Sequence, residues 1–209
     1  MTEYRIPTAP GESEYIEKRS RFIGHVRGVE TEDEAREYIA EMKKKYYDAR
    51  HNCWCYIIRG GAERYSDDGE PQGTAGIPML EVFRRENVDN VVCVVTRYFG
   101  GVLLGTGGLL RAYTKSAKDA LDAAGISVVR RWAETELACS YAQCEKLKLE
   151  ISSAGGIVAA LDYGVGVTVR ALVPEELVDD FSARIFDVTA GSVNVNVVGE
   201  ELRAVPLPR

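Results

Sequence analysis

The sequence predicts an α+β protein built from two domains, residues 1–133 and residues 134–209. Three observations lead to this class. The length of 209 residues suits one large domain or two small ones. Hydrophobic residues make up 45% and charged residues 28% of the chain, as in globular proteins, which excludes collagen-like and disordered classes. Strand and helix patterns follow one another differently before and after Ala133, where we place the boundary.

In the first part, a polar lead precedes Ser20–Val29, where apolar residues alternate as in a strand. Thr31 and Glu34 have the spacing of a capping box, in which the hydroxyl accepts a helix N–H and the carboxylate reaches back, so a helix is expected from here to Tyr46. Asn90–Tyr98 is the most apolar segment and predicts a central strand covered on both faces. The other expected elements are a strand at Asp48–Arg59, a long polar loop at Gly60–Gly76, a short helix at Pro78–Glu86, a helix at Leu109–Ala123 and a short strand at Ile126–Arg131.

The second part is expected to have the order β-α-β-β-α-β, the ferredoxin-like arrangement. Its predicted elements are a strand at Thr135–Cys139, a helix at Tyr141–Ser153, strands at Ile157–Tyr163 and Val165–Val173, a helix at Pro174–Phe186 and an edge strand at Ser192–Val198. The helix periodicity turns Cys144, Leu147, Leu149 and Ile151 inward. For the first domain, a parallel Rossmann-type sheet is the alternative, and it is disfavoured because strand–helix alternation begins late.

Charge and apolar runs indicate where the protein acts. No run approaches the roughly 18 apolar residues that span a bilayer, and the first residues lack the basic and apolar regions of a secretory signal. Five cysteines without a regular framework argue against a secreted disulfide scaffold. We therefore expect a cytoplasmic protein with no membrane partner.

The net charge of −6 argues against a protein that coats nucleic acid generally. Residues 1–133 hold 20 Lys and Arg against 20 Asp and Glu, whereas residues 134–209 hold 6 against 12. Any contact with phosphate is therefore expected in the first domain.

An acidic loop, Ser66–Gly76, places Asp67, Asp68 and Glu70 within four residues. Carboxylates at this spacing offer hard oxygen ligands for Mg²⁺ or acceptors for a substrate amine. Asp and Gly are also common in solvated turns, because Asp caps locally and Gly tolerates positive φ. The spacing leaves both readings open.

A glycine-rich segment, Arg97–Gly108, joins the central strand to the next helix. Glycines at a helix start expose backbone N–H groups, which bind anions together with the helix dipole, but they also allow close packing of helix on strand. Neither a Walker A loop nor Gly-x-Gly-x-x-Gly is present. Arg111, Lys115 and Lys118 follow at i, i+4 and i+7, so they form a cationic stripe that suits phosphate or a solvated face.

His51, Cys53 and Cys55 share one face of a predicted strand, which raises the possibilities of a zinc site and of a cysteine nucleophile. A zinc site needs a fourth ligand, and no second Cys pair supplies it. No pattern places a base next to either thiol, and His25 fits a strand position. We predict no catalytic residue, no metal ligand and no cofactor.

Three segments together resemble the motifs of the YigZ/IMPACT family: DARHNCWCY (Asp48–Tyr56), YSDDGEPQGTAGIPML (Tyr65–Leu80) and VVTRYFGGVLLGTGGLLRAY (Val94–Tyr113). The second domain resembles the C-terminal extension of bacterial members. The resemblance implies a first domain like ribosomal protein S5 domain 2, and a whole chain like domains IV and V of elongation factor G.

Eukaryotic relatives in this family act as translational regulators. The resemblance therefore implies a non-enzymatic binding or regulatory protein linked to translation, with RNA, the ribosome or a translation-associated protein as partner. The alternative is an enzyme or binder acting on a phosphorylated small molecule or nucleotide through the glycine-rich loop, because small-molecule kinases share the S5-domain-2-like superfamily. The oligomeric state stays open.

The predicted binding surface combines the first strand of the motif region, the acidic loop, the glycine-rich loop and the helix that follows it. It consists of Arg50, His51, Asp67, Asp68, Glu70, Gly73, Thr74, Arg97, Tyr98, Gly100, Gly101, Gly105, Gly107, Gly108, Arg111 and Lys115.

Overall fold

The structure is a computed structural model that describes residues 3–207, and it divides into two compact units. The N-terminal unit comprises residues 4–129 with 204–207, and the C-terminal unit comprises residue 3 with 130–203. Each unit has its own hydrophobic core and its own layer of helices on a sheet. Within residues 3–207, no helix is long and apolar enough to cross a membrane.

The N-terminal unit contains a five-stranded antiparallel sheet in the order β2-β3-β6-β4-β5. Its strands are β2 (Gly11–Glu17), β3 (Ser20–Gly28), β4 (His51–Ile57), β5 (Glu63–Ser66) and β6 (Val91–Tyr98). The strand expected to be central is central: β6 lies between β3 and β4, and Val91 to Val95 are fully buried. Apolar residues on both faces of a strand require cover on both faces, and the helices supply it.

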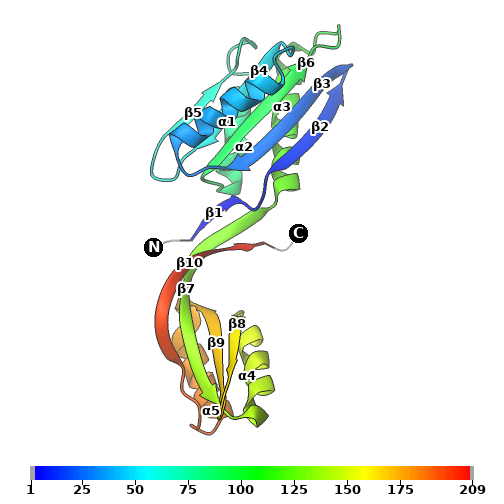
Figure 1. The fold of residues 1–209 in the computed structure, drawn as a ribbon. Helices are drawn as coiled ribbons and strands as arrows, with labels where there is room; N and C mark the ends of the chain where they lie inside the picture. Colours follow the sequence, from blue (N-terminus) through cyan, green and yellow to red (C-terminus); the bar gives the residue numbers. More distant parts are fainter. Residues whose placement is uncertain (1–2, 208–209) are drawn as a thin grey trace. The chain divides into compact units, whose positions relative to one another are not determined.

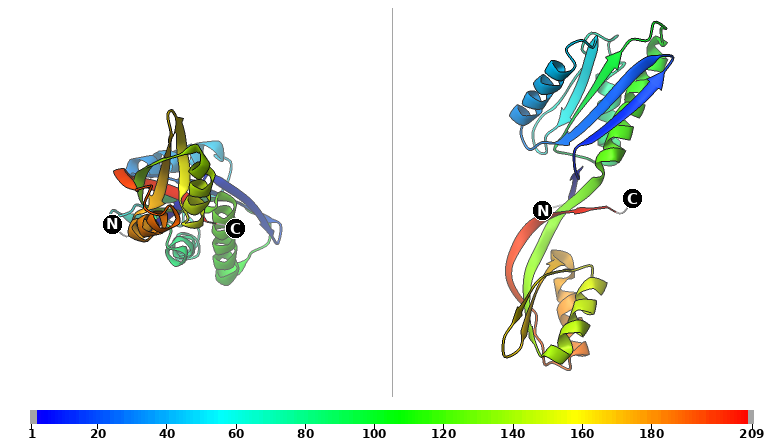
Figure 2. Two further views of the ribbon diagram at one scale, coloured as in Figure 1. Left: turned by 90° about the horizontal axis from the view of Figure 1, so that it is seen from below. Right: turned by 45° about the vertical axis from the view of Figure 1, so that its right-hand side comes forward.

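Helix α1 (Glu32–Lys45) covers one face of this sheet, and helices α2 (Gly76–Glu86) and α3 (Gly105–Ala124) cover the other (Figures 1 and 2). The Thr31 hydroxyl accepts a hydrogen bond from the Glu34 N–H at 3.2 Å, as the capping box predicts. The Glu34 carboxylate accepts instead from the N–H of Glu30, one residue before the cap.

Three strands of the N-terminal unit were not expected. β1 (Tyr4–Pro7) and β2 lie in the polar lead, and β5 lies inside the segment expected to be one long loop. β5 is an exposed edge strand that pairs with β4, so it lacks the apolar alternation that announces a half-buried strand. The polar loop expected at Gly60–Gly76 is therefore interrupted by a strand and is shorter than predicted.

Helix α3 begins at Gly105 rather than at Leu109, so three of the glycines lie in its first turn. The residues expected on its buried side are buried: Leu109, Tyr113, Ala117, Ala120, Leu121 and Ala124. Gly125 ends the helix, with φ +72° and its N–H on the Leu121 carbonyl.

The C-terminal unit has the predicted order β-α-β-β-α-β. Its elements are most of β7 (Ile126–Cys139), α4 (Tyr141–Ser153), β8 (Ile157–Tyr163), β9 (Val167–Pro174), the single turn η1 (Glu175–Leu177), α5 (Val178–Val188) and most of β10 (Asn196–Pro206). The first residues of β7 and the last residues of β10 belong to the N-terminal unit. These strands belong to a five-stranded sheet in the order β1-β7-β9-β8, in which β10 also pairs with β7. Helices α4 and α5 cover one face of the part formed by β7, β9 and β8 (Figure 2).

Several details of this part differ from the sequence-based expectation. The two strands expected at Ile126–Arg131 and Thr135–Cys139 are one strand, β7, which pairs with β1 at its start and with β9 at its end. The last strand starts at Asn196 rather than Ser192. Leu149 is 69% exposed rather than inward, because α4 buries only the narrower stripe of Cys144, Leu147 and Ile151.

Candidate functional site

Asp67 caps helix α2. Its two carboxylate oxygens accept hydrogen bonds from the backbone N–H groups of Gly73, Ala75 and Gly76 at 2.8, 3.0 and 2.8 Å. Thr74 is buried beside them, and its hydroxyl donates to the Pro71 carbonyl at 2.7 Å. A carboxylate at a helix N-terminus satisfies amides that have no partner in the helix and complements the dipole. Asp67, Gly73 and Thr74 therefore form a structural cap.

Asp68 fastens the same loop to the start of β4. One of its oxygens accepts from the Asn52 N–H at 2.7 Å, and the other pairs with Lys43 of α1 at 2.7 Å. The Asp68 carbonyl lies 2.8 Å from Nδ1 of His51. His51, which the sequence placed at the predicted surface, is thus held by a backbone group, and no carboxylate among residues 3–207 pairs with it.

Glu70 is buried and forms an ion pair with Arg97 of β6 at 2.6 Å. The same oxygen accepts from the hydroxyl of Tyr113 in α3 at 2.8 Å. Arg97 is itself only 6% exposed, and its guanidinium lies over the rings of Phe22 and Phe99. Arg97 and Glu70 were predicted on a binding surface, but both lie in the interior.

The three carboxylates of the acidic loop thus have separate partners inside the N-terminal unit. Within residues 3–207, no three His, Cys, Asp or Glu side chains come together as metal ligands. The arrangement supports the reading in which the carboxylates fix the loop, because each one already accepts hydrogen bonds or pairs with a cation.

The end of the sheet beside the loop is formed by Tyr98 and the glycines that follow it. The Tyr98 hydroxyl donates to Asp48 at 2.8 Å. The N–H of Gly100 donates to the Ser20 hydroxyl at 3.2 Å. A Cβ on Gly100 would lie 2.0 Å from the Arg19 carbonyl carbon, so only glycine fits this approach. Gly101 has φ +84° and faces open space.

The first turn of α3 is open. The side chain of its N-cap residue, Leu104, makes no capping hydrogen bond, and the turn contains no acidic residue. Gly105 and Gly107 are exposed and Gly108 is half-buried, so the amides of this turn are not shielded by side chains of their own. The orphan N–H groups and the positive end of the dipole make this position favourable for an anion.

The predicted cationic stripe is largely paired. Lys115 forms an ion pair with Asp119 at 2.8 Å, and Lys118 pairs with Asp122 and Glu86. Arg111 is exposed and has no ion pair among residues 3–207, and the same holds for Arg50 at the start of β4. Arg111 is therefore the member of the cationic stripe that keeps a free charge in the described part of the chain, and Arg50 is a second free cation of the predicted binding surface.

Two further cations at this end were missed from the sequence. Lys18 and Arg19 form the turn between β2 and β3, both with positive φ, and both are exposed without an ion pair in the described part of the chain. The polar lead gave no sign of the hairpin that brings them to Gly100. We call the set Lys18, Arg19, Arg50, Phe99–Leu104 and Arg111, with the first turn of α3, the glycine-loop edge.

The cysteines do not resemble an active nucleophile. Burial raises the pKa of the Cys53 thiol well above its usual range, and burial and the neighbouring Cys93 do the same for Cys55. The Cys53 thiol donates to the Asp67 carbonyl at 3.0 Å. A nucleophilic cysteine needs a lowered pKa or an adjacent base; both thiols have a raised pKa, and no base lies beside either of them among residues 3–207.

Comparisons with known proteins agree with the motifs. Residues 18–121 match the model of the Impact N-terminal domain, and residues 137–192 match a domain of unknown function, DUF1949. A solved structure described as the crystal structure of an hypothetical protein superposes with a TM-score of 0.60 at 32% identity, covering 95% of this chain and 98% of that one.

Two curated relatives are similar over most of their length. IMPACT family member YvyE of Bacillus subtilis (strain 168) is 36% identical, over 88% of this chain and 86% of that protein. IMPACT family member YigZ of Escherichia coli (strain K12) is 34% identical, over 96% of this chain and 100% of that protein. Identity at this level over whole chains, with the two domain models in order, establishes that the chain belongs to the IMPACT family.

Proposed function

We propose that this protein is a non-enzymatic binding protein linked to translation, which contacts RNA or the ribosome through the glycine-loop edge. The observation that carries the proposal is the open first turn of α3 beside cations that have no ion pair among residues 3–207. A translation-associated protein is the alternative partner. The link to translation comes from the family resemblance, and the site of action would be the cytoplasm.

Charge supports phosphate as the ligand group at this edge. The carboxylates of the acidic loop accept bonds from the protein itself, so they do not oppose an anion with free negative charge. The cations come from a hairpin turn, a strand start and a helix, which together can follow a backbone of several phosphates. The exposed side chains of Phe99, Val102 and Leu103 add apolar surface that can pack on bases.

The fold names and domain limits belong to the same proposal. The strand order β10-β7-β9-β8 supports a ferredoxin-like C-terminal domain, and the three helices on one five-stranded sheet support an S5-domain-2-like N-terminal domain. We propose the boundary near Ala133, within the long strand β7.

The test is binding of a single-stranded RNA oligonucleotide to the full chain as a function of salt. We expect affinity to fall steeply with salt, and the double variant Arg50→Glu/Arg111→Glu to bind weakly with a salt slope lower by about 0.7 for each lost phosphate contact. Arg64→Glu is the matched control, because Arg64 is exposed on β5 and its guanidinium donates to the neighbouring Glu63 carbonyl without an ion pair in the described part of the chain. Affinity that ignores salt, or that the double variant retains, would refute RNA binding at this edge.

The open turn of α3 also favours a second candidate, a phosphorylated small molecule or nucleotide held by the same amides. Thermal denaturation with ATP and Mg²⁺ separates the two functions. A nucleotide at 100 times its Kd stabilises the fold by about 2.7 kcal/mol, whereas a surface that needs several phosphates in a row gives no such stabilisation with one nucleotide.

A further inference from the structure

We infer that the glycine-loop edge selects single-stranded RNA over duplex RNA, because one unpaired base stacks on the ring of Phe99. The inference rests on the proposed RNA contact, and it adds the form of RNA that is bound and the residue that selects it. The observation that carries it is an exposed aromatic ring between cations that have no ion pair among residues 3–207.

Phe99 follows directly on the central strand β6, and its side chain is 44% exposed. The guanidinium of Arg97 lies over the ring, 5.6 Å from its centroid, and Arg97 is itself buried and paired with Glu70 at 2.6 Å. The ring is therefore supported from the interior of the unit, while much of its surface stays open to solvent. A contact surface that is held in place before the ligand arrives costs little ordering on binding.

Two exposed cations flank Phe99 along the end of the sheet. On one side, Gly100 approaches the hairpin turn so closely that a Cβ on it would lie 2.0 Å from the carbonyl carbon of Arg19. On the other side, the register of β4 on β6 places Arg50 next to the last residue of β6. The strands β3 and β4 are the two neighbours of β6, so the backbones that carry these cations lie about 10 Å apart with the ring between them.

The charges around the ring favour a polyanion. The Nη1 atom of Arg111 would lie 3.5 Å from a Cβ on Gly107, so this guanidinium lies over the first turn of α3. Two carboxylates belong to the same end of the sheet, Glu17 beside the hairpin turn and Asp48 before β4, and each accepts a tyrosine hydroxyl. The four cations of the glycine-loop edge outnumber these two carboxylates, and the surplus complements phosphates.

A ring between cations fits a strand whose bases have free faces. Inside a duplex, each base is stacked between its neighbours, so phosphates and sugars alone reach a protein surface of this shape. In a single strand, one base can turn onto the ring while the phosphates on either side meet the cations. Stacking on an aromatic side chain strengthens binding about five- to 150-fold per base, whereas contacts to phosphate serve both forms of RNA.

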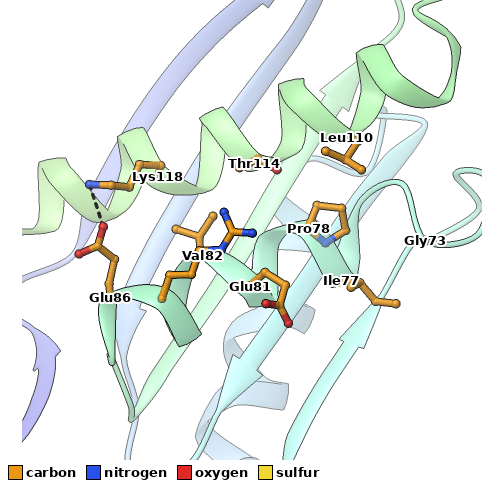
Figure 3. Close-up of a pocket in the computed structure, with 10 residues that line it drawn as sticks. Gly73, Ile77, Pro78, Glu81, Val82, Glu86, Leu110, Thr114 and Lys118 are labelled. Carbon is orange, nitrogen blue, oxygen red and sulfur yellow. Dashed lines mark ion pairs between the residues drawn. The ribbon is translucent and has the colours of Figure 1, made fainter.

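The groove between α2 and α3 is a poorer place for the strand. Lys118, which lines it, pairs with Glu86 at 3.4 Å and also with Asp122, and Arg84 beside it is shared by two carboxylates (Figure 3). Cations that are neutralised within the protein release no counterions when they meet a phosphate. The phosphate contacts are therefore expected at the glycine-loop edge.

The experiment titrates the full chain with three RNAs of about 12 nucleotides at one salt concentration. The first is a single strand without self-complementarity, the second is the duplex of this strand with its complement, and the third is the single strand with abasic residues in place of its bases. We expect the first to bind at least about fivefold more tightly than either of the others, because it alone offers free base faces.

A pair of variants separates stacking from a structural role of Phe99. Phe99→Leu keeps an apolar side chain and removes the ring, so it should weaken binding of the single strand by at least about fivefold and leave the duplex and the abasic strand unchanged. Tyr65→Leu is the matched control, because Tyr65 is 45% exposed on β5, and it should leave all three affinities unchanged. A ring that only supports the fold would weaken all three RNAs together.

Phe99→Trp gives a direct readout that does not depend on the stability of the leucine variant. The single strand should quench the fluorescence of the new indole, whereas the duplex and the abasic strand should leave it unchanged. The parent chain, with Trp54 and Trp132, provides the blank.

Three outcomes would overturn the inference. They are a duplex that binds as tightly as the single strand, a Phe99→Leu variant that weakens both equally, and an indole fluorescence that the single strand does not change. Each of them leaves the proposed RNA contact in place as long as binding falls with salt and depends on Arg50 and Arg111. Binding without that dependence would refute the RNA contact itself, so the two failures are distinguishable.

Discussion

Glu70 and Arg97 form an ion pair whose side chains are only 3% and 7% exposed, with Oε1 of Glu70 2.6 Å from the guanidinium. The pair joins the acidic loop to the central strand β6, and Tyr113 adds α3 to the same carboxylate. Three segments that the sequence singled out as one surface thus meet in the interior of the N-terminal unit. The polar residues of these motifs hold the loop and α3 in place, and the glycine-loop edge depends on that placement.

Removing one partner of this pair should cost more than removing both. Glu70→Leu leaves a buried guanidinium without its counter-charge, and we expect a loss of about 3–5 kcal/mol in the free energy of unfolding. Glu70→Leu/Arg97→Met should recover much of that loss, because two apolar side chains of similar volume replace the charges. Urea denaturation of the two variants measures this coupling. Losses that simply add would contradict it.

Asp67 should be the carboxylate of the loop whose loss most affects α2. Asp67→Ala removes the acceptor of three backbone N–H groups, and we expect a loss of about 1–2 kcal/mol in the free energy of unfolding. Asp67→Asn keeps one acceptor oxygen, so its free energy of unfolding should lie between those of the wild-type chain and Asp67→Ala. Glu37→Gln, at an exposed position of α1, is the control. An unchanged Asp67→Ala variant would show that water replaces the cap.

The helices and strands with strong apolar periodicity could be predicted from the sequence. The polar strands and turns, and the residues with which they pair, could not. β6 and the buried side of α3 follow from apolar periodicity, because burial on one or two faces leaves a pattern in the chain. β5 and the hairpin turn at Lys18 and Arg19 leave none, since exposed edge strands take polar residues on both faces.

The candidate site shows the same limit. The spacing of Asp67, Asp68 and Glu70 puts three carboxylates in one loop, but their directions are set by residues far away in sequence. Glu70 points into the interior because it pairs there with Arg97 and accepts a hydrogen bond from Tyr113. Asp68 points toward Lys43 and forms an ion pair with it. Sequence spacing fixes which residues share a loop, and tertiary packing decides which of them stay on the surface.

His25 should make stability depend on pH. Burial lowers the pKa of this imidazole below its usual value of about 6.5. As pH falls through 6.5, the unfolded chain binds a proton that the folded chain does not, so the free energy of unfolding falls by up to about 1.4 kcal/mol per pH unit. The fall ends below the folded-state pKa. Urea titrations between neutral and mildly acid pH should show this slope, and His25→Gln should flatten it. An equal slope in the variant would exclude His25 as its source.

The buried thiols should resist alkylation. A raised pKa keeps Cys53 and Cys55 protonated at neutral pH, and burial blocks access, so iodoacetamide should leave both unmodified in the native chain. The urea-unfolded chain should be modified at all five cysteines, as mass spectrometry would show. Rapid modification of Cys53 in the native state would instead reveal an activated thiol and would restore the catalytic reading.

Gly100 and Gly101 at the glycine-loop edge are required for different reasons. Gly100 is required by a close backbone contact, and Gly101 is required by its positive φ. Gly101→Ala places an ordinary residue at φ +84° in open space, which should cost about 1–2 kcal/mol. Gly100→Ala should cost more, because its Cβ would lie 2.0 Å from the Arg19 carbonyl carbon and the hairpin turn must move. That movement displaces Lys18 and Arg19 from α3, so Gly100→Ala should also weaken RNA binding more than Gly101→Ala does. Denaturation and RNA titration of the two variants provide both comparisons. Equal losses of stability would mean that the turn yields freely, and equal affinities would mean that Lys18 and Arg19 take no part in the contact.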